Sequence, residues 1–493
     1  MEITQGSPPA SAPRATARWW ALATAGAAQL MVVLDSTVVN IALPSVQSDL
    51  GLSDAARGWV VTAYALAFGG LLLIGGRVSD RFGQKRAFIG GLVGFAIASG
   101  IAGMASTADL LFVGRAAQGA FAAVLAPAAL SLISTMFVEP RERGMAFGVF
   151  GALTGVGAAV GLLVGGLLTE YLSWNWCLLI NLPIAALVLA RAVLLPSDAP
   201  ASGAISLDLP GTALSVLGML AVVFSFSDMA DHGWSDPVVL AVLAAGLLLM
   251  VGFVLHERRT TRPLLPLRVV SDRTRAGAFL VLGLPQISMF GFFLFLTYYL
   301  QGVLGYSPLR TGLAFLPLSL AIGIGSTAIS GVLAPRLSPR AIIVPALLMM
   351  AAGIALMIGL GAGGPGVYLT RLLPAELLIG LGLGCVIAPA ISMATAGVDP
   401  DDAGVASATV NVVQQLGGSV GTALLNTIAT AAAGTYLATH PGATLRATVH
   451  GFDIALIVAV TVVAVTALIA AVMLRTRRPA VAPGPEASRE GLS

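Results

Sequence analysis

Apolar residues gather into long runs along this chain of 493 residues, and short polar segments separate the runs. A helix needs about 20 apolar residues to cross a bilayer, because each residue adds about 1.5 Å. The runs are long enough for this, so the pattern predicts fourteen membrane-spanning helices. They are expected over residues 19–41, 58–76, 87–105, 110–133, 144–168, 176–195, 210–226, 237–255, 276–300, 312–333, 341–360, 372–396, 404–433 and 452–474.

The positive charges test this count, because Lys and Arg near span ends hold a loop in the cytoplasm. With the N-terminus inside, one of the 26 cations lies within a span and four lie in outer loops, while all the others fall inside. A missed or extra span would invert the later loops and remove this bias. We therefore expect a multi-pass protein of the cell inner (cytoplasmic) membrane with both termini cytoplasmic. The exceptions are Arg115 within a span and Arg57, Arg310, Arg371 and Arg446 outside.

The composition agrees with a polytopic membrane protein. Apolar residues make up 57% of the chain and charged residues 10%, whereas about a quarter of a soluble domain is charged. Cys177 and Cys385 lie far apart, in or beside apolar runs, and form neither a disulfide framework nor a metal cluster. The first apolar run has no A-x-A-like cleavage site and further spans follow it, so we interpret it as the first span and not as a removable signal.

The connection between the second and third spans, residues 76–86 (GRVSDRFGQKR), is short and carries four cations and one acid. Its two glycines are expected to let two helices approach closely where the chain reverses. The segment resembles the signature loop between helices 2 and 3 of the major facilitator superfamily, with Val78 where Leu is usual. The matching positions are Gly76, Asp80, Arg81, Gly83 and Lys85.

Three further stretches resemble that superfamily. Residues 34–44 (LDSTVVNIALP) look like the signature of its fourteen-helix drug:proton antiporters, and residues 115–119 (RAAQG) resemble the RxxQG motif of helix 4. The antiporter motif of helix 5 has its counterpart between residues 157 and 166, where Leu162 replaces the proline of the pattern. That departure puts in doubt the bend that the proline supports. The glycines that match are Gly157, Gly161, Gly165 and Gly166.

The resemblance covers nearly the whole chain outside the tails. It implies an all-α membrane protein with the major facilitator fold, two six-helix bundles plus two inserted helices. Residues 331–340 echo residues 76–85, but they follow the tenth span and not the eighth, which indicates that two helices are inserted before them. We predict cytoplasmic tails at 1–17 and 476–493, six-helix bundles at 18–196 and 266–475, and the inserted pair with its linkers at 197–265.

Asp35 is the first candidate for chemistry. A carboxylate in hydrocarbon costs several kcal/mol unless it is paired, protonated or hydrated. Asp35 lies about 9 Å from the outer end of its span and Arg115 about 8 Å from the outer end of the fourth, so the two can meet. Pairing favours the carboxylate and an empty apolar cavity favours the neutral acid, so alternation between them can load and release a proton. The alternative is a static pair that holds two helices together.

Other polar residues are candidates for a substrate cavity or a gate. Glu376 lies about 6 Å inside the twelfth span, either as a second acid for a cationic substrate or as a snorkelling group near Arg371. Asn411 and Gln415 share one helix face and either line the cavity or bond neighbouring helices. The loop with Asp80 and Arg81 resembles a latch that closes the cytoplasmic side, although its cations also serve orientation. Tyr64 and Gln118 complete the cavity candidates.

Several classes of function are excluded by the sequence. No GxxxxGK[ST] segment is present, so we expect no ATP site, and the four histidines lack metal-ligand spacing, so we expect no metal. The sequence has no cluster of catalytic side chains at membrane depth, and its basic loops serve orientation. We therefore expect no enzyme, no cofactor and no nucleic-acid partner. The resemblance implies a proton-coupled transporter that exports amphipathic, often cationic drugs or antibiotics by alternating access. Its partners would be the substrate, protons and the bilayer, and no oligomer is required. A carrier for uptake or facilitated diffusion of a small metabolite is the alternative.

Overall fold

The computed structural model describes residues 15–54, 56–137, 139–195, 208–260, 263–333, 336–361, 364, 366–396, 398 and 403–474. Within these ranges every regular element is a helix. The chain divides into two compact units. Unit 1 comprises Met1–Leu264 with Leu300–Ala314, and unit 2 comprises Leu265–Tyr299 with Phe315–Ser493.

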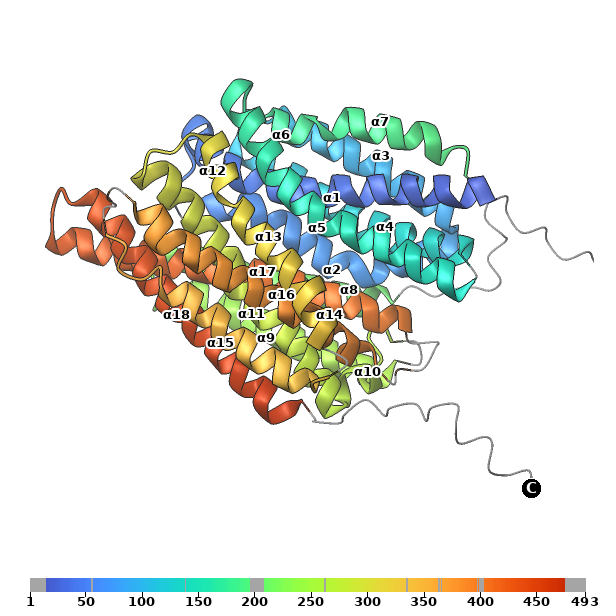
Figure 1. The fold of residues 1–493 in the computed structure, drawn as a ribbon. Coiled ribbons are helices and arrows are strands. Elements are labelled where there is room, and N and C mark those ends of the chain that lie inside the picture. Colours follow the sequence, from blue (N-terminus) through green and yellow to red (C-terminus); the bar gives the residue numbers. More distant parts are fainter. Residues whose placement is uncertain are drawn as a thin grey trace, which may run out of the picture. The chain divides into compact units, whose positions relative to one another are not determined.

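Unit 1 is built mainly on long helices (Figure 1), and some of them start at side-chain caps. Thr107 caps one of them by accepting a hydrogen bond from the amide of Leu110, and Asp236 caps another. Such caps satisfy amides that have no partner within the helix. The helices are α1 (Ala15–Leu50), α2 (Trp59–Phe82), α3 (Gln84–Gly103), α4 (Ala108–Met136), α5 (Pro140–Tyr171), α6 (Trp176–Leu179), α7 (Asn181–Ala192), α8 (Leu209–His232), α9 (Pro237–Arg259) and α12 (Pro308–Ala314), with a 3₁₀ turn at Ala56–Gly58.

Unit 2 contains π-helical turns beside its α-helices. Two of them, η3 (Gly325–Ile329) and η4 (Tyr368–Leu372), interrupt or precede helices of this unit, and η2 (Tyr299–Val303) stands at the junction with unit 1. Such turns are rare and occur frequently at functional sites. The α-helices are α10 (Leu267–Ser271), α11 (Arg273–Tyr298), α13 (Leu316–Ile324), α14 (Ser330–Leu333), α15 (Pro339–Ala355), α16 (Leu373–Thr395), α17 (Ala403–Thr439) and α18 (Thr444–Met473).

Each predicted span coincides with a helix or with consecutive helices. Among the described residues, nine helices are long and apolar enough to cross a bilayer. Four further spans match shorter apolar helices, and the span at 404–433 lies within α17, which has 37 residues. The all-α membrane architecture is therefore confirmed, while the predicted domain boundaries stay a prediction. The shorter helices are Ala56–Leu72, Ala159–Tyr171, Trp176–Ala192 and Pro339–Ala355.

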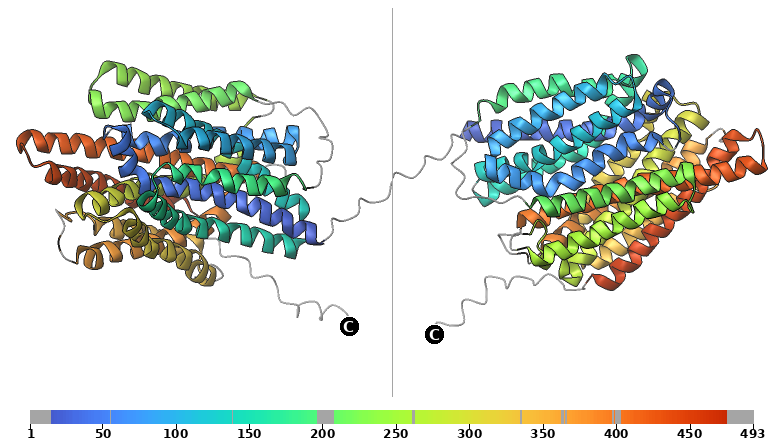
Figure 2. Two further views of the ribbon diagram at one scale, coloured as in Figure 1. Left: turned by 90° about the horizontal axis from the view of Figure 1, so that it is seen from above. Right: turned by 180° about the vertical axis from the view of Figure 1, so that it is seen from behind.

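Helices α8 and α9 pack side by side in unit 1, as both views in Figure 2 show in green. Large apolar side chains of α9 that do not pack on α8 are exposed, with Leu248 at 70% and Val251 at 55% of full exposure. Large apolar side chains of this kind are stable against lipid but not against water. The pair therefore presents a lipid-facing surface, as expected of helices added to a bundle.

Two glycines near the end of α2 have separate structural roles. A Cβ atom on Gly75 would overlap the backbone carbonyl of Ala123, so α2 and α4 touch backbone to backbone there. A Cβ atom on Gly76 would have no atom within 4 Å, so the close approach of two helices predicted at Gly76 is wrong. Gly83 has φ 94°, a left-handed conformation that favours glycine, at the turn into α3.

These adjacent glycines provide a matched test of the packing. We expect Gly75→Ala to destabilise unit 1 by about 1–3 kcal/mol, the usual cost of overpacking, because the added methyl meets backbone that cannot move aside. Gly76→Ala, one residue later on the same helix, should leave stability almost unchanged. Thermal unfolding of the purified protein in one detergent measures both, and equal unfolding temperatures for the two variants would contradict the packing.

Candidate functional site

Asp35 lies at the centre of a buried polar network inside unit 1. Its side chain is 0% exposed, and three donors surround the carboxylate. Oδ2 accepts a hydrogen bond from Arg115 Nη1 at 2.6 Å, while Oδ1 accepts from Gln118 Nε2 at 2.9 Å and from Asn181 Nδ2 at 2.7 Å. Charge-assisted bonds to both oxygens stabilise the ionised carboxylate strongly. Both carboxylate oxygens of Asp35 are therefore bonded within the network.

Arg115 balances this charge from α4. It is 1% exposed, and its Nε donates to the carbonyl of Val60 at 3.0 Å, while its Nη1 also donates to Gln118 Oε1 at 3.0 Å. Its guanidinium carbon lies 4.5 Å from the ring centroid of Tyr64, within the range of a cation–π contact. The contact between Asp35 and Arg115 that their similar depths predict is confirmed, and the ion pair joins α1 to α4.

Two residues that the sequence analysis missed close the network. Asn181, the first residue of α7, and Ser99 of α3 are both fully buried. Asn181 Nδ2 and Gln118 Nε2 each lie 2.9 Å from Ser99 Oγ, which donates to the carbonyl of Leu178 at 2.7 Å. The signal that could have found Asn181 is a lone amide early in the sixth apolar run, at a depth similar to that of Asp35.

Tyr64, predicted to line a cavity, forms one wall of this network. Tyr64 is 3% exposed, and its ring contacts the Arg115 guanidinium and the ring of Phe68, whose centroid is 5.9 Å away. Its hydroxyl and Asn181 Oδ1 are buried with no hydrogen-bond partner among the described residues. Each of these two atoms can therefore form a further hydrogen bond.

The glycines of the helix 5 motif bring α1 and α5 together beside Asp35. A Cβ atom on Gly161 would overlap Thr37 Oγ1, and one on Gly165 would lie 2.8 Å from the carbonyl of Val38. A Cβ atom on Gly157 would lie 2.9 Å from the side chain of Leu30, also on α1. Gly166 packs instead against α12, where a Cβ atom would lie 2.8 Å from the carbonyl of Pro308. At Leu162, where the motif has proline, α5 continues unbroken. The glycine motif therefore fixes the helix that carries Asp35.

The remaining cavity candidates lie in unit 2. Glu376 is 0% exposed on α16, and Arg371 donates to the carbonyls of Leu356 and Ile358, at 3.0 Å each. Asn411 is exposed on α17 and donates to the carbonyl of Ser407 at 3.2 Å, while Gln415 is half-buried one turn later. A role for these residues in substrate binding stays a prediction.

The gate candidates lie where α2 meets α3. Lys85 donates to the carbonyls of Val193 and Leu195 beyond the end of α7, the former at 2.8 Å. Arg81 is exposed and lies 5.6 Å from the ring centroid of Phe82. The side chain of Asp80 lies outside the described residues, so the latch that it would form stays a prediction.

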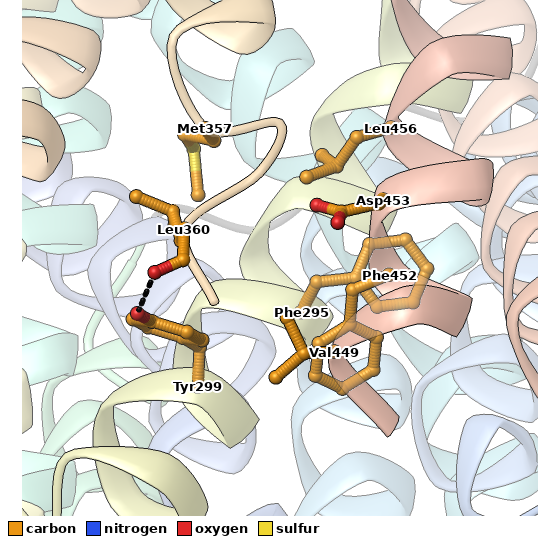
Figure 3. A pocket seen from close by; sticks show the side chains of 8 residues that line it. All are labelled: Phe295, Tyr299, Met357, Leu360, Val449, Phe452, Asp453 and Leu456. Carbon is orange, nitrogen blue, oxygen red and sulfur yellow. Dashed lines mark hydrogen bonds between the residues drawn. The ribbon is translucent and has the colours of Figure 1, made fainter. Parts of the chain in front are cut away.

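A narrow pocket in unit 2 is lined by apolar side chains and one acid (Figure 3). Asp453 Oδ1 accepts a hydrogen bond from the amide of Gly359 at 2.8 Å, and Tyr299 donates weakly to the carbonyl of Leu360 at 3.5 Å. Its free space is roughly that of one water molecule, far below the several hundred Å³ of a site for a drug-sized ligand. The other lining residues are Phe295, Met357, Val449, Phe452 and Leu456.

Comparison with known proteins finds relatives over most of the chain. A family model described as Major Facilitator Superfamily matches residues 25–422. The puromycin resistance protein pur8 of Streptomyces alboniger is 57% identical over 466 residues, covering 94% of this chain and 92% of that protein. The cephamycin export protein CmcT of Amycolatopsis lactamdurans is 39% identical over 438 residues, covering 86% of this chain and 88% of that protein.

The fold also has a counterpart among solved structures. It is similar to the crystal structure of a bacterial homologue of the human lysosomal transporter Spinster, in an inward-facing and occupied conformation, with a TM-score of 0.67. The alignment covers 96% of this chain and 98% of that chain at 17% identity. At this identity the likeness concerns the fold alone.

The network predicts a specific pattern of stability. Arg115→Ala leaves a buried carboxylate with two amide donors, and losing one partner of a buried ion pair costs about 3–5 kcal/mol. We expect a lower unfolding temperature, partly restored in the double variant Asp35→Asn/Arg115→Ala, because that variant has no charge left in the network. Arg446→Ala, which removes an exposed arginine of α18, is the control. An Arg115→Ala variant as stable as this control would contradict the assigned pairing.

Proposed function

This chain belongs to the Major Facilitator Superfamily, and we propose that it exports amphipathic, often cationic antibiotics in exchange for protons by alternating access. Export is supported by relatives that are named for resistance to puromycin and for export of cephamycin. Proton coupling is supported by one observation, the fully buried ion pair between Asp35 and Arg115. Burying an ion pair at this depth is costly in free energy, and ionisable residues inside a membrane are usually functional.

The chemistry of coupling follows from the carboxylate's two possible settings. While Arg115, Gln118 and Asn181 donate to it, Asp35 remains charged. When helix movement separates α1 from α4 or α7, the carboxylate loses donors and the neutral acid becomes favoured, so a proton binds. Return of the donors expels that proton. The network then works as a protonation switch whose state depends on the conformation of the helices.

The energy available per proton fits this task. One proton moving inward gains about 2.3 kcal/mol per 100 mV of membrane potential and about 1.4 kcal/mol per pH unit. One proton per cycle thus supports a gradient of a neutral substrate of roughly tenfold to a few hundredfold. We place the protein in the bacterial inner membrane with both termini in the cytoplasm, following the bias of its positive charges.

We expect Asp35→Asn to abolish proton-driven efflux while membrane insertion stays intact, because an amide at this position binds no proton but keeps the side chain's size. Inside-out vesicles with an imposed pH gradient and puromycin as the probe measure this. Asp54→Asn is the control, since Asp54 is a carboxylate with a 61% exposed side chain, outside the network.

Two outcomes would count against the proposal. Wild-type accumulation of puromycin in Asp35→Asn vesicles would remove this carboxylate from the coupling mechanism. Transport of a small metabolite down its own gradient, with no response to pH and no puromycin movement, would favour the alternative carrier function.

A further inference from the structure

Glu376 is a second carboxyl group buried within the membrane-spanning part of the chain, and its surroundings are the opposite of those of Asp35. It lies in the first turn of α16 and is 0% exposed. Both of its carboxyl oxygens are buried without a hydrogen-bond partner among the described residues. Most buried polar groups in folded proteins have a partner, so a carboxyl group with none requires an explanation.

The helices around Glu376 are packed too closely to leave it exposed. On one side of α16 a Cβ atom on Gly353 of α15 would lie 2.8 Å from the carbonyl of Ala375. On another side a Cβ atom on Gly380 would lie 2.6 Å from the carbonyl of Leu318 in α13. Glu376 shares a helix face with Leu372 and Gly380, four residues away in each direction, and both Leu372 and Leu318 are 0% exposed.

No cation neutralises this carboxyl group among the described residues. Arg371, one helical turn earlier, directs its Nε and Nη2 atoms to the carbonyls of Leu356 and Ile358 instead. Helix α13 carries no ionisable side chain. On the other elements packed against α16, ionisable groups lie near helix ends: Arg273, Arg275 and Tyr298 on α11, Arg340 on α15, Tyr368 and Arg371 on η4, and Tyr436 on α17.

An ionised carboxylate in such surroundings would cost several kcal/mol, so the neutral acid is the form that fits this conformation. A neutral acid still carries an O–H donor and acceptor atoms that remain unpartnered here. This arrangement is costly as a permanent state and reasonable as one state of a cycle. The π-helical turns η4, directly before α16, and η3, packed against it, are irregularities of the kind found frequently at functional sites.

We propose that Glu376 is a second exchangeable proton site of the transporter, located in unit 2 and independent of the Asp35 network. In the conformation described here the site holds its proton. When α13, α15 and α16 rearrange and water reaches the carboxyl group, the O–H bond breaks and the proton passes to water. This inference rests on the proposed transport function for its role in the cycle, but not for its chemistry.

Infrared spectroscopy of the purified protein in lipid tests the site without any substrate. The wild-type protein should show the C=O band of a protonated carboxylic acid at neutral pH, and this band should be replaced by carboxylate bands as the pH rises. Glu376→Gln should lack this pH-dependent band, and Asp35→Asn should keep it. Should Glu376→Gln fail to accumulate, Glu376→Asp serves instead and should move the pH at which the band disappears.

Two infrared results would overturn the inference. In the first, Glu376→Gln removes no protonated-acid band from the wild-type spectrum, which would mean that Glu376 is already ionised. The other is a band that persists unchanged at all pH values at which the protein stays folded, which would make Glu376 a fixed structural group.

A transport measurement then tests its role in the cycle. In vesicles with a pH difference of one unit and no membrane potential, the limiting accumulation ratio of puromycin should fall about tenfold in Glu376→Gln, because one proton fewer moves per cycle. An unchanged limiting ratio would exclude Glu376 from the coupled protons. If the wild-type protein moves no puromycin, the proposed function fails, while the infrared result still decides whether the site exists.

Discussion

The ion pair between Asp35 and Arg115 is the interaction on which unit 1 depends. Two full charges lie at 0% and 1% exposure, where neither is stable without the other. Gln118 and Asn181 donate to the Asp35 carboxylate, and Ser99 bonds both of these amides, so four helices, α1, α3, α4 and α7, meet in one network. The glycines of α5 hold α1 close enough for this geometry. Any movement of one of these helices changes the charge balance at Asp35.

The two buried carboxyl groups illustrate how surroundings assign a protonation state. Asp35 has three donors, whereas Glu376 has none among the described residues, and the proposed cycle assigns the charged form to the first and the neutral form to the second. Burying either group in a bilayer is costly. In the proposed cycle, helix movement changes the surroundings of each group and so converts conformation into proton binding. The two sites lie in different units, so each responds to the packing of its own set of helices.

The sequence predicted much of this architecture because membrane helices follow directly from the length of apolar runs. The contact of Asp35 with Arg115 was also predictable, since depth along a helix can be counted in residues. Gly76 was expected at a close approach of two helices, whereas the glycine that touches another helix is its neighbour Gly75, which packs against α4. Adjacent residues on a helix differ by about 100° in direction, and counting residues does not give the direction. Ser99 and Asn181 were missed for a related reason. Serine and asparagine are unremarkable in a helical span until the direction of each side chain is known.

The central claim is that the pair between Asp35 and Arg115 changes with the protonation state of Asp35. The most direct test is an experimental structure of the protein at acid pH, determined with the same network resolved. The account predicts that Arg115 Nη1 and Asp35 Oδ2, which are 2.6 Å apart here, will lie beyond hydrogen-bond distance and that a water-filled path will reach the carboxyl group. An unchanged pair, sealed in the same way at acid pH while the helices have moved, would contradict it.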